Sequence, residues 1–166
     1  MSIQLLMETM SKLQEAHEAL LVLAREKPRV LVKNDVEQLN NIVNKESRWI
    51  RGIQELNLER IQHIGSYLIS RGYNPNPKIT VADLVKIIFK AEEKQLLIQA
   101  QQKLVETMKT LKVENEINQQ LIEQSLSFIN YTVDLVLGVP EDDVIYQRPN
   151  QVPYGAKRPG LFDTKA

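Results

Sequence analysis

Histidines, cysteines and neighbouring carboxylates are the residues that most often perform chemistry, and few of them occur here in useful patterns. The chain has no cysteine, and its two histidines, His17 and His63, each lack the i, i+4 partner of a helical zinc pair. The adjacent carboxylates of Glu92 and Glu93 lie among lysines, as they would on a solvated helix face. We interpret both histidines as surface or core side chains. We therefore expect no enzyme activity, no catalytic residue, no metal site and no cofactor.

The isolated glycines and the single tryptophan are interpreted as structural. Gly52 and Gly65 stand alone within helical patterns rather than together in a phosphate-binding loop. We interpret them as points of close helix packing. Trp49 is interpreted as a core residue or an anchor at a helix crossing rather than as a binding hot spot.

Length and charge restrict the class of protein. The 166 residues suit one domain with an appendage at most. Basic and acidic residues number 21 each, so no global field draws the chain to nucleic acid or to an anionic membrane. The absence of cysteine fits a reducing compartment, and no run approaches the roughly 18 apolar residues of a membrane-spanning helix. We expect a cytoplasmic protein without nucleic-acid binding or membrane insertion.

The N-terminal segment has the apolar spacing of an amphipathic helix. Its apolar residues recur at intervals of three and four, which predicts a buried stripe on one face. Pro28 should end this helix at about residue 26 or 27, because proline removes a backbone donor and clashes with the preceding turn. The stripe consists of Ile3, Leu6, Met10, Leu13, Ala16, Leu20 and Leu23.

A second long helix is predicted after the first. Asn34 is interpreted as its N-cap, with Asp35 and Glu37 in the first turn, where acidic side chains are favourable. Gly72 supplies the residue expected just past the end of a helix.

Two further helices follow a turn at residues 73–78, which contains two prolines and two asparagines. Thr80 and Asp83 resemble a capping box and predict the start of a short helix. No proline or glycine interrupts residues 91–137, which predicts the longest helix. The sequence thus predicts an all-α fold: an elongated antiparallel helical bundle or coiled coil of three long helices plus one short helix, with a disordered C-terminal tail.

The stretch 114–138 is apolar around most of its circumference. On a helix its apolar and small residues cover an arc of about 240°, whereas a helix that rests on one neighbour needs about 100°. The excess surface requires a second cover. That cover is either another helix of the same chain or a partner protein.

The composition changes after Gly138. Residues 139–166 contain four of the seven prolines and an acidic cluster at 141–143, so we expect a tail without a fixed fold of its own. The tail also carries spaced apolar residues, including Tyr146 and Tyr154, which suit recognition as a short motif. We divide the chain into a bundle domain, 1–138, and a flexible proline-rich tail, 139–166.

Two parts of the chain resemble the FlgN family of flagellar export chaperones. The C-terminal signature is carried by Asn118, Leu121, Ile122, Ser125, Leu126, Phe128 and Ile129, followed by a tail tyrosine. The N-terminal half of the family's sequence pattern is matched by residues 33–36 with Leu39, Ile42 and Glu46, and by Leu56, Glu59 and Arg60.

The resemblance implies both a fold and a function. It implies an antiparallel helical bundle that binds hook-filament junction (hook-associated) proteins before export and delivers them to the type III export apparatus. It also implies that a tail tyrosine contacts the export gate; Tyr146 matches that role best and Tyr154 competes with it. The export ATPase complex is a further candidate partner, and the chaperone itself is expected to be a monomer or weak homodimer.

The apolar arc and the resemblance together predict a client-binding surface on the last helix, at about 91–137. The contact residues are predicted to be Leu121, Ile122, Leu126, Phe128, Ile129 and Val133, with Asn118 and Ser125 setting the register. The alternative is that most of these residues pack inside the bundle of the monomer.

Two other classes of function also use an apolar helix face. A structural coiled-coil protein would use the same apolar face to close a homodimer or a larger bundle. A membrane-surface module would need basic residues beside its apolar face, and residues 117–137 contain no lysine or arginine. The composition therefore disfavours the membrane-surface module.

Overall fold

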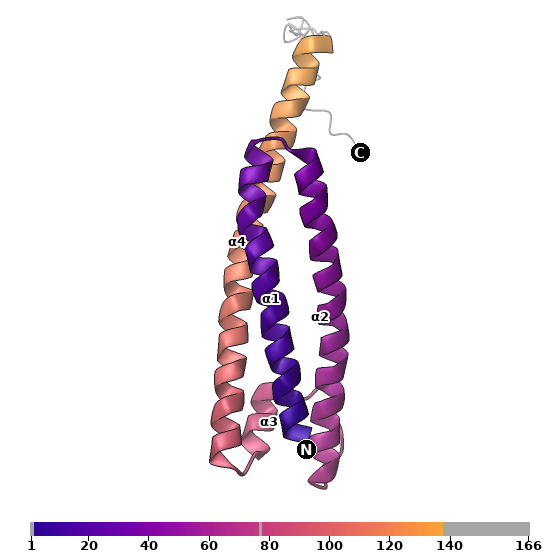
Figure 1. Ribbon diagram of the computed structural model, residues 1–166, viewed down its shortest axis with the longest axis vertical. Helices are drawn as coiled ribbons and strands as arrows, with labels where there is room; N and C mark the ends of the chain where they lie inside the picture. Colours follow the sequence, from indigo (N-terminus) through magenta and orange to yellow (C-terminus); the bar gives the residue numbers. More distant parts are fainter. Residues whose placement is uncertain (1, 77, 138–166) are drawn as a thin grey trace, which may run out of the picture. The chain divides into compact units, whose positions relative to one another are not determined.

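The computed structural model describes residues 2–76 and 78–137, and within them every regular element is a helix. The helices are α1 (Ser2–Val32), α2 (Val36–Ser70), α3 (Val81–Ile87) and α4 (Ala91–Leu137) (Figure 1). Residues 1–129 form one compact unit, and the last turns of α4, from Asn130, belong to a second. The predicted all-α bundle of three long helices and one short helix is confirmed. The predicted tail, 139–166, lies outside the described residues.

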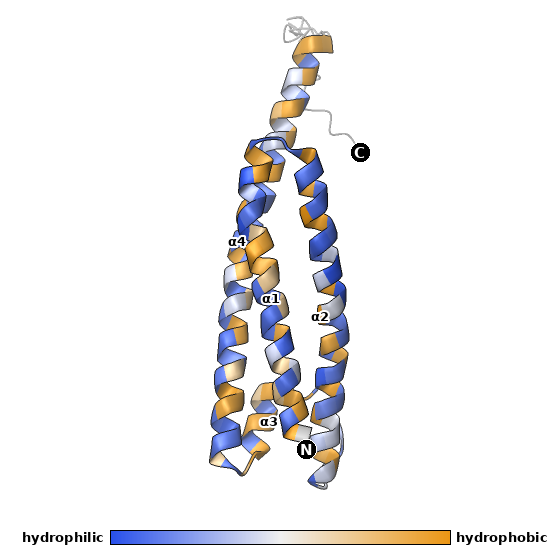
Figure 2. Cartoon of the chain, viewed as in Figure 1, coloured by the Kyte–Doolittle hydropathy of each residue, from blue (hydrophilic) through white to orange (hydrophobic). Residues whose placement is uncertain are grey.

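The main core lies at one end of the first unit, where α3 meets the three long helices. α2 runs antiparallel to α1 and to the first part of α4 (Figure 1), and Figure 2 shows apolar residues gathered around α3. Five leucines are almost completely buried there, each worth about 1.5–3 kcal/mol of burial. They are Leu6, Leu13, Leu68, Leu84 and Leu97. The predicted apolar stripe of α1 is buried along its whole length.

A smaller cluster holds α1 and α2 together near the turn that joins them. It contains Leu23 and Val30 of α1 and Ile42 of α2, with Leu39 packed against it. The core is therefore large at the α3 end and small at the turn end. This difference leaves the turn end of α4 more exposed.

The helix predicted to end before Pro28 instead continues to Val32, so that prediction is wrong. In an uninterrupted helix the N–H of residue 28 would bond to the carbonyl of Ala24, four residues earlier, and proline has no N–H. In this structure the side-chain Nδ2 of Asn118, on α4, donates to the Ala24 carbonyl at 2.8 Å. A donor from the neighbouring helix replaces the missing backbone donor, and α1 continues.

The start of α2 differs from its prediction by one residue. The N-cap is Asp35, whose side chain accepts a hydrogen bond from the backbone N–H of Gln38 at 3.0 Å. Asn34 instead has a φ of 52°, the left-handed conformation that asparagine tolerates better than most residues. A carboxylate at the N-cap also interacts favourably with the helix dipole, which explains why Asp35 takes this position.

Other predicted helix ends are confirmed. Gly72, with a φ of 78°, follows α2, and the N–H of Tyr73 donates to the Leu68 carbonyl at 2.9 Å. Thr80 and Asp83 form a reciprocal capping box at the start of α3. These bonds satisfy backbone groups that helix ends leave unpaired.

The interpretation of Gly52 as a point of close packing is wrong, and so is the placement of Trp49 in the core. Trp49 is 42% exposed and is not a core residue. A Cβ placed on Gly52 would meet no atom within 4 Å, so this glycine does not mark close packing. Gly65 does approach a neighbour, but that neighbour is Pro75 in the loop, at the ordinary separation of 3.9 Å. Of the two histidines, His17 is buried and His63 is half-buried.

The bond between Asn118 and Ala24 predicts a coupling between Asn118 and Pro28. Asn118→Ala should lower the free energy of unfolding by about 1–3 kcal/mol, because it leaves a buried carbonyl unpaired. In a Pro28→Ala background the new N–H at residue 28 can pair with Ala24, so the same change should cost about 1 kcal/mol less. Urea unfolding of the four proteins measures this coupling. Equal costs in both backgrounds would contradict the assignment, and Asn115→Ala, at an exposed position one turn away, is the control.

The capping box predicts a pH dependence of stability. Hydrogen bonds from the Thr80 hydroxyl, the Lys86 ammonium and the Thr80 backbone N–H lower the pKa of Asp83 from 3.8 to about 2. Because the folded pKa lies below the unfolded value, ionised Asp83 stabilises the fold above about pH 4, and this contribution is lost as the pH falls toward about 2. Urea titrations should show the stability difference between wild type and Asp83→Asn shrinking over that range. A difference independent of pH would refute this role.

Candidate functional site

The predicted client-binding residues on α4 have very different exposures. Asn118 is 2% exposed, and Leu121, Ile122 and Ser125 are half-buried. The remaining residues are exposed, with Phe128 at 66%: they are Leu126, Phe128 and Ile129 in the first unit and Val133 in the second. The arc is therefore covered by the bundle on one side only. Client binding itself stays a prediction.

Four of the predicted residues line one apolar hollow at the turn between α1 and α2, which we name the turn hollow. α4 contributes Ile122, Ser125, Leu126 and Ile129. The opposite walls come from the end of α1 and the start of α2: Val30, Leu31, Asn34, Asp35, Val36 and Leu39. The hollow has a volume of about 260 Å³. It could receive one or two apolar side chains of a partner.

Asn118 lies between α4 and α1 rather than on the outer surface. Its Nδ2 donates to the Ala24 carbonyl, while its Oδ1 is buried and accepts no hydrogen bond from the described residues. Its contact with Ala24 is thus made within the bundle and fixes the position of α4 along α1. The sequence reasoning assigned Asn118 a register role, and the structure gives it a partner in the same chain.

Polar contacts continue this connection between α1 and α4. Gln14 Nε2 donates to Thr107 at 2.8 Å and to Glu18 at 2.7 Å, and Lys103 pairs with Glu18 at 3.1 Å. The hydrogen bond from Gln14, and then that from Lys103, lower the pKa of the Glu18 carboxyl. Arg25 pairs with Glu114 at 3.2 Å nearer the turn. These contacts position α4 beside α1 but do not form a reactive group.

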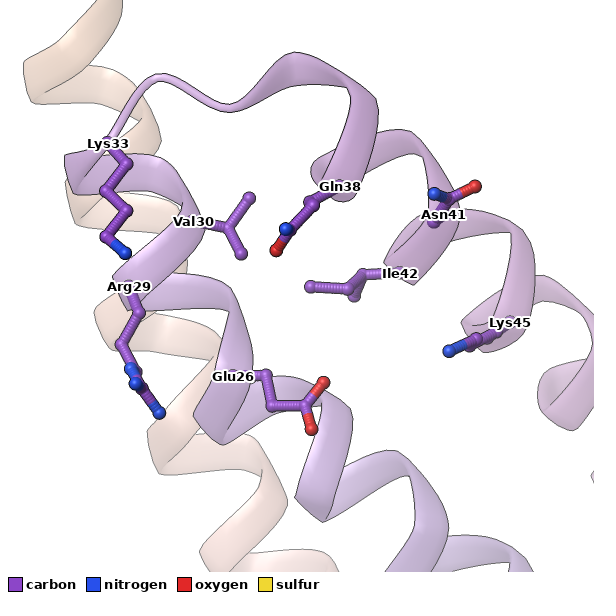
Figure 3. A pocket seen from close by; sticks show the side chains of 8 residues that line it. All are labelled: Glu26, Arg29, Val30, Lys33, Gln38, Asn41, Ile42 and Lys45. Carbon is purple, nitrogen blue, oxygen red and sulfur yellow. The ribbon is translucent and has the colours of Figure 1, made fainter.

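A second hollow lies on another face of the α1–α2 pair, with a volume of about 410 Å³ (Figure 3). Figure 3 shows Val30, Gln38 and Ile42 pointing into the space between the two helices. Its charged residues, Glu26, Arg29, Lys33 and Lys45, come from both helices, and their charged ends do not meet at one point. A small-molecule site needs a few convergent polar groups, and this hollow does not provide them.

Neither a cluster of metal-binding side chains nor a membrane-spanning helix occurs in the described part of the chain. Within residues 2–76 and 78–137, no group of three or more histidine, aspartate or glutamate side chains could hold a metal ion. No helix in this part of the chain is both long and apolar enough to cross a membrane. Tyr146 and Tyr154 lie outside the described residues, so their predicted role is not tested.

Comparison with known proteins identifies the family. The family model described as "FlgN protein" matches residues 1–153. The chain belongs to the FlgN family. This FlgN-family chain is also 32% identical over 169 residues to a Bacillus subtilis (strain 168) protein with the printed name "Uncharacterized protein YvyG", and the match covers 100% of both chains. No solved structure matches it significantly.

Membership confirms the resemblance read from the sequence. The FlgN family is a family of flagellar chaperones and not of enzymes, and it implies flagellar proteins as partners.

Sequence reasoning missed the residues that α1 and α2 contribute to the site. Val30 and Leu31 lie after the expected end of the first helix, and Leu39 carries part of the family resemblance but was not predicted to contact a client. The signal that could have found Val30 and Leu31 is the apolar run Val30–Val32, which begins two residues after Pro28 and indicates a helix that continues beyond the proline.

The exposures on α4 predict small stability effects at the proposed contact. Leu126→Ala should change the free energy of unfolding by no more than about 0.5 kcal/mol, as expected for an exposed residue. Leu97→Ala removes a fully buried side chain on the same helix and should cost about 2–5 kcal/mol. Urea unfolding compares the two variants. If Leu126→Ala costs as much as Leu97→Ala, Leu126 belongs to the core of the bundle.

Proposed function

We propose that this FlgN-family protein is a cytoplasmic export chaperone for hook-filament junction proteins. It binds their helical terminal segments, prevents premature association and delivers them to the flagellar type III export apparatus. Family membership supports the chaperone class. The observation that carries the finer proposal is the exposed apolar surface of α4 beside the turn hollow, formed by Leu126, Phe128 and Ile129.

Physical chemistry favours a helical client for such a surface. An export substrate held partly unfolded exposes the apolar stripes of its terminal helices, and these stripes self-associate in water. Burying these stripes against α4 contributes a favourable free energy of about 25 cal/mol for each Å² of apolar surface, and a typical interface buries roughly 800 Å² on each partner. Ordering the client offsets most of that gain, so the affinity falls in the micromolar to nanomolar range and binding is reversible.

The contact residues proposed for the client are those predicted from the sequence, except Asn118, whose buried amide bonds to Ala24 within the bundle. Leu121, Ile122, Leu126, Phe128, Ile129 and Val133 supply apolar contacts, and Ser125 helps to set the register. The proposal includes a tail tyrosine, Tyr146 or Tyr154, as the contact with the export gate. It also includes a monomer or weak homodimer as the free form.

Titration of purified hook-filament junction proteins into the full-length chain tests the proposal. We expect a one-to-one complex with at least one of them. Phe128→Ser should weaken it at least tenfold, and Leu58→Ser, at an exposed leucine on α2, should not. A version ending at Gly138 should keep the client and lose binding to the purified export gate, and Tyr146→Ala or Tyr154→Ala should show which tyrosine is responsible.

Two results would reject the proposal. One is that no junction protein binds. The other is a tight dimer of the free chain in sedimentation, with the apolar surface of α4 buried between the two copies, which would favour the coiled-coil scaffold.

A further inference from the structure

The turn hollow is one end of a longer groove. Three more hollows lie along α1 between the turn hollow and α3. We number them from the α3 end, and each shares lining residues with the next. The first and second share His17 and Met108; the second and third share Leu111, Asn115 and Gln119; the third shares Ile122 with the turn hollow. The four hollows therefore form one continuous groove that α1 and α4 line throughout, and α2 adds a wall in every hollow except the second.

The lining residues repeat every seven positions, as they do along a helix-packing seam. On α4 they include Gln101, Met108, Asn115, Ile122 and Ile129. On α1 they include Leu13, Leu20 and Lys27, and Asn34, in the turn after α1, follows seven residues later. Because one helix face lines the groove from Gln101 to Ile129, the groove is about 42 Å long at about 1.5 Å per residue.

The structure also contains an example of what fits this groove. Thr80 and Val81, at the start of α3, line its first hollow. From there α3 buries Val81, Leu84 and Val85 against α1, α2 and α4, at the end of the bundle where α4 begins (Figure 1). A two-turn amphipathic helix thus occupies the fourth position beside the three long helices. The groove continues along the same position beyond α3.

The chemistry of the groove matches an amphipathic helix. Leu20, Ile50 and Met108 supply apolar surface, while amides such as Asn115 and Gln119 supply hydrogen-bonding groups. An ion pair of Lys27 and Glu46, at 2.7 Å and largely buried, joins α1 to α2 within the third hollow and fixes its shape. Such a groove matches a helix with an apolar stripe flanked by polar residues.

We propose that this groove binds one amphipathic helix of the exported client, about 25–28 residues long, which lies along α1 between α2 and α4 and completes a four-helix bundle. The inference rests on the proposed function for the source of the helix. The groove inference goes beyond the proposed function because α1 and α2 become part of the client contact. The residues after Gly138 are a poor match for this length, since prolines at 140, 149, 153 and 159 interrupt them.

Arginine substitutions on the walls of the groove test this inference. Ile50 and Met108 line the groove and are 48% and 47% exposed, so Ile50→Arg and Met108→Arg should leave the bundle folded. Leu58 and Val113 are matched controls on the same two helices, 62% and 55% exposed and outside the four hollows. We expect the two groove variants to weaken binding of a purified junction protein at least tenfold and the controls to change it less than twofold. Circular dichroism melting of the free variants verifies that all four are folded.

The outcomes separate this inference from the proposed function. If Phe128→Ser weakens binding and both groove variants bind normally, the client lies on α4 alone and the groove inference is wrong while the proposed function stands. If no junction protein binds, the proposed function fails, and the assigned occupant fails with it.

An engineered cysteine identifies the other possible occupants. The chain contains no cysteine, so Ile50→Cys accepts a single environment-sensitive dye. A blue shift on addition of the junction protein supports the proposal. If the dye is already shielded in the free chain and becomes exposed on removing residues 139–166, the chain's own C-terminal segment is the occupant. If its shielding instead follows protein concentration, a second copy occupies the groove. Either result overturns the proposal.

Discussion

A side-chain hydrogen bond between Asn118 and Ala24 fixes the position of α4 along α1, beside which further polar contacts hold it. Pro28 leaves the carbonyl of Ala24 without its helical donor, and Asn118 supplies one from α4. A bond to a buried backbone carbonyl is directional and short, so it defines one position of α4 along α1, whereas leucine contacts alone would tolerate sliding. The same bond allows α1 to run to Val32, which places the turn, and with it the turn hollow, opposite Ile122 and Ile129.

The α3 end of the bundle and the later part of α4 contribute differently to stability. Apolar residues of α1, α2, α3 and the first part of α4 bury one another around Leu84 and Leu97, and this cluster supplies most of the stability. Farther along α4, polar contacts such as Gln14 with Thr107 and Arg25 with Glu114 hold the helix beside α1 without covering its apolar side. The fold can therefore expose apolar surface on α4 while its core remains intact.

The sequence predicted the parts of this fold that depend on local rules. The period of the α1 stripe, the capping box of Thr80 and Asp83, and the stop at Gly72 each depend on neighbouring residues, and all three are confirmed. The end of α1 was mispredicted because the donor that compensates for Pro28 lies 94 residues away from Ala24 in the sequence. Trp49 was mispredicted for a similar reason: its exposure depends on how closely α2 approaches the other helices, which helical periodicity does not encode.

The site could be predicted only in part. Leucines and isoleucines at helical spacing identified α4 as the helix with surplus apolar surface, and Leu126, Phe128 and Ile129 are exposed. The walls that α1 and α2 add, including Val30 and Leu39, arise from tertiary packing across the turn. The apolar residues after Pro28 indicate that α1 continues, but no local pattern in either helix indicates that these residues face α4.

The uneven distribution of the core has a consequence for motion. Backbone amides near Leu6, Leu68 and Leu97 become accessible only when most of the bundle unfolds, so their hydrogens should exchange with solvent at the global rate. Amides near Leu23, Val30 and Ile42 are protected by a cluster of only a few side chains and can exchange through a smaller, sub-global opening. The turn end can thus widen and close repeatedly while the α3 end stays folded, and an incoming helix would meet the chain at its most adaptable part.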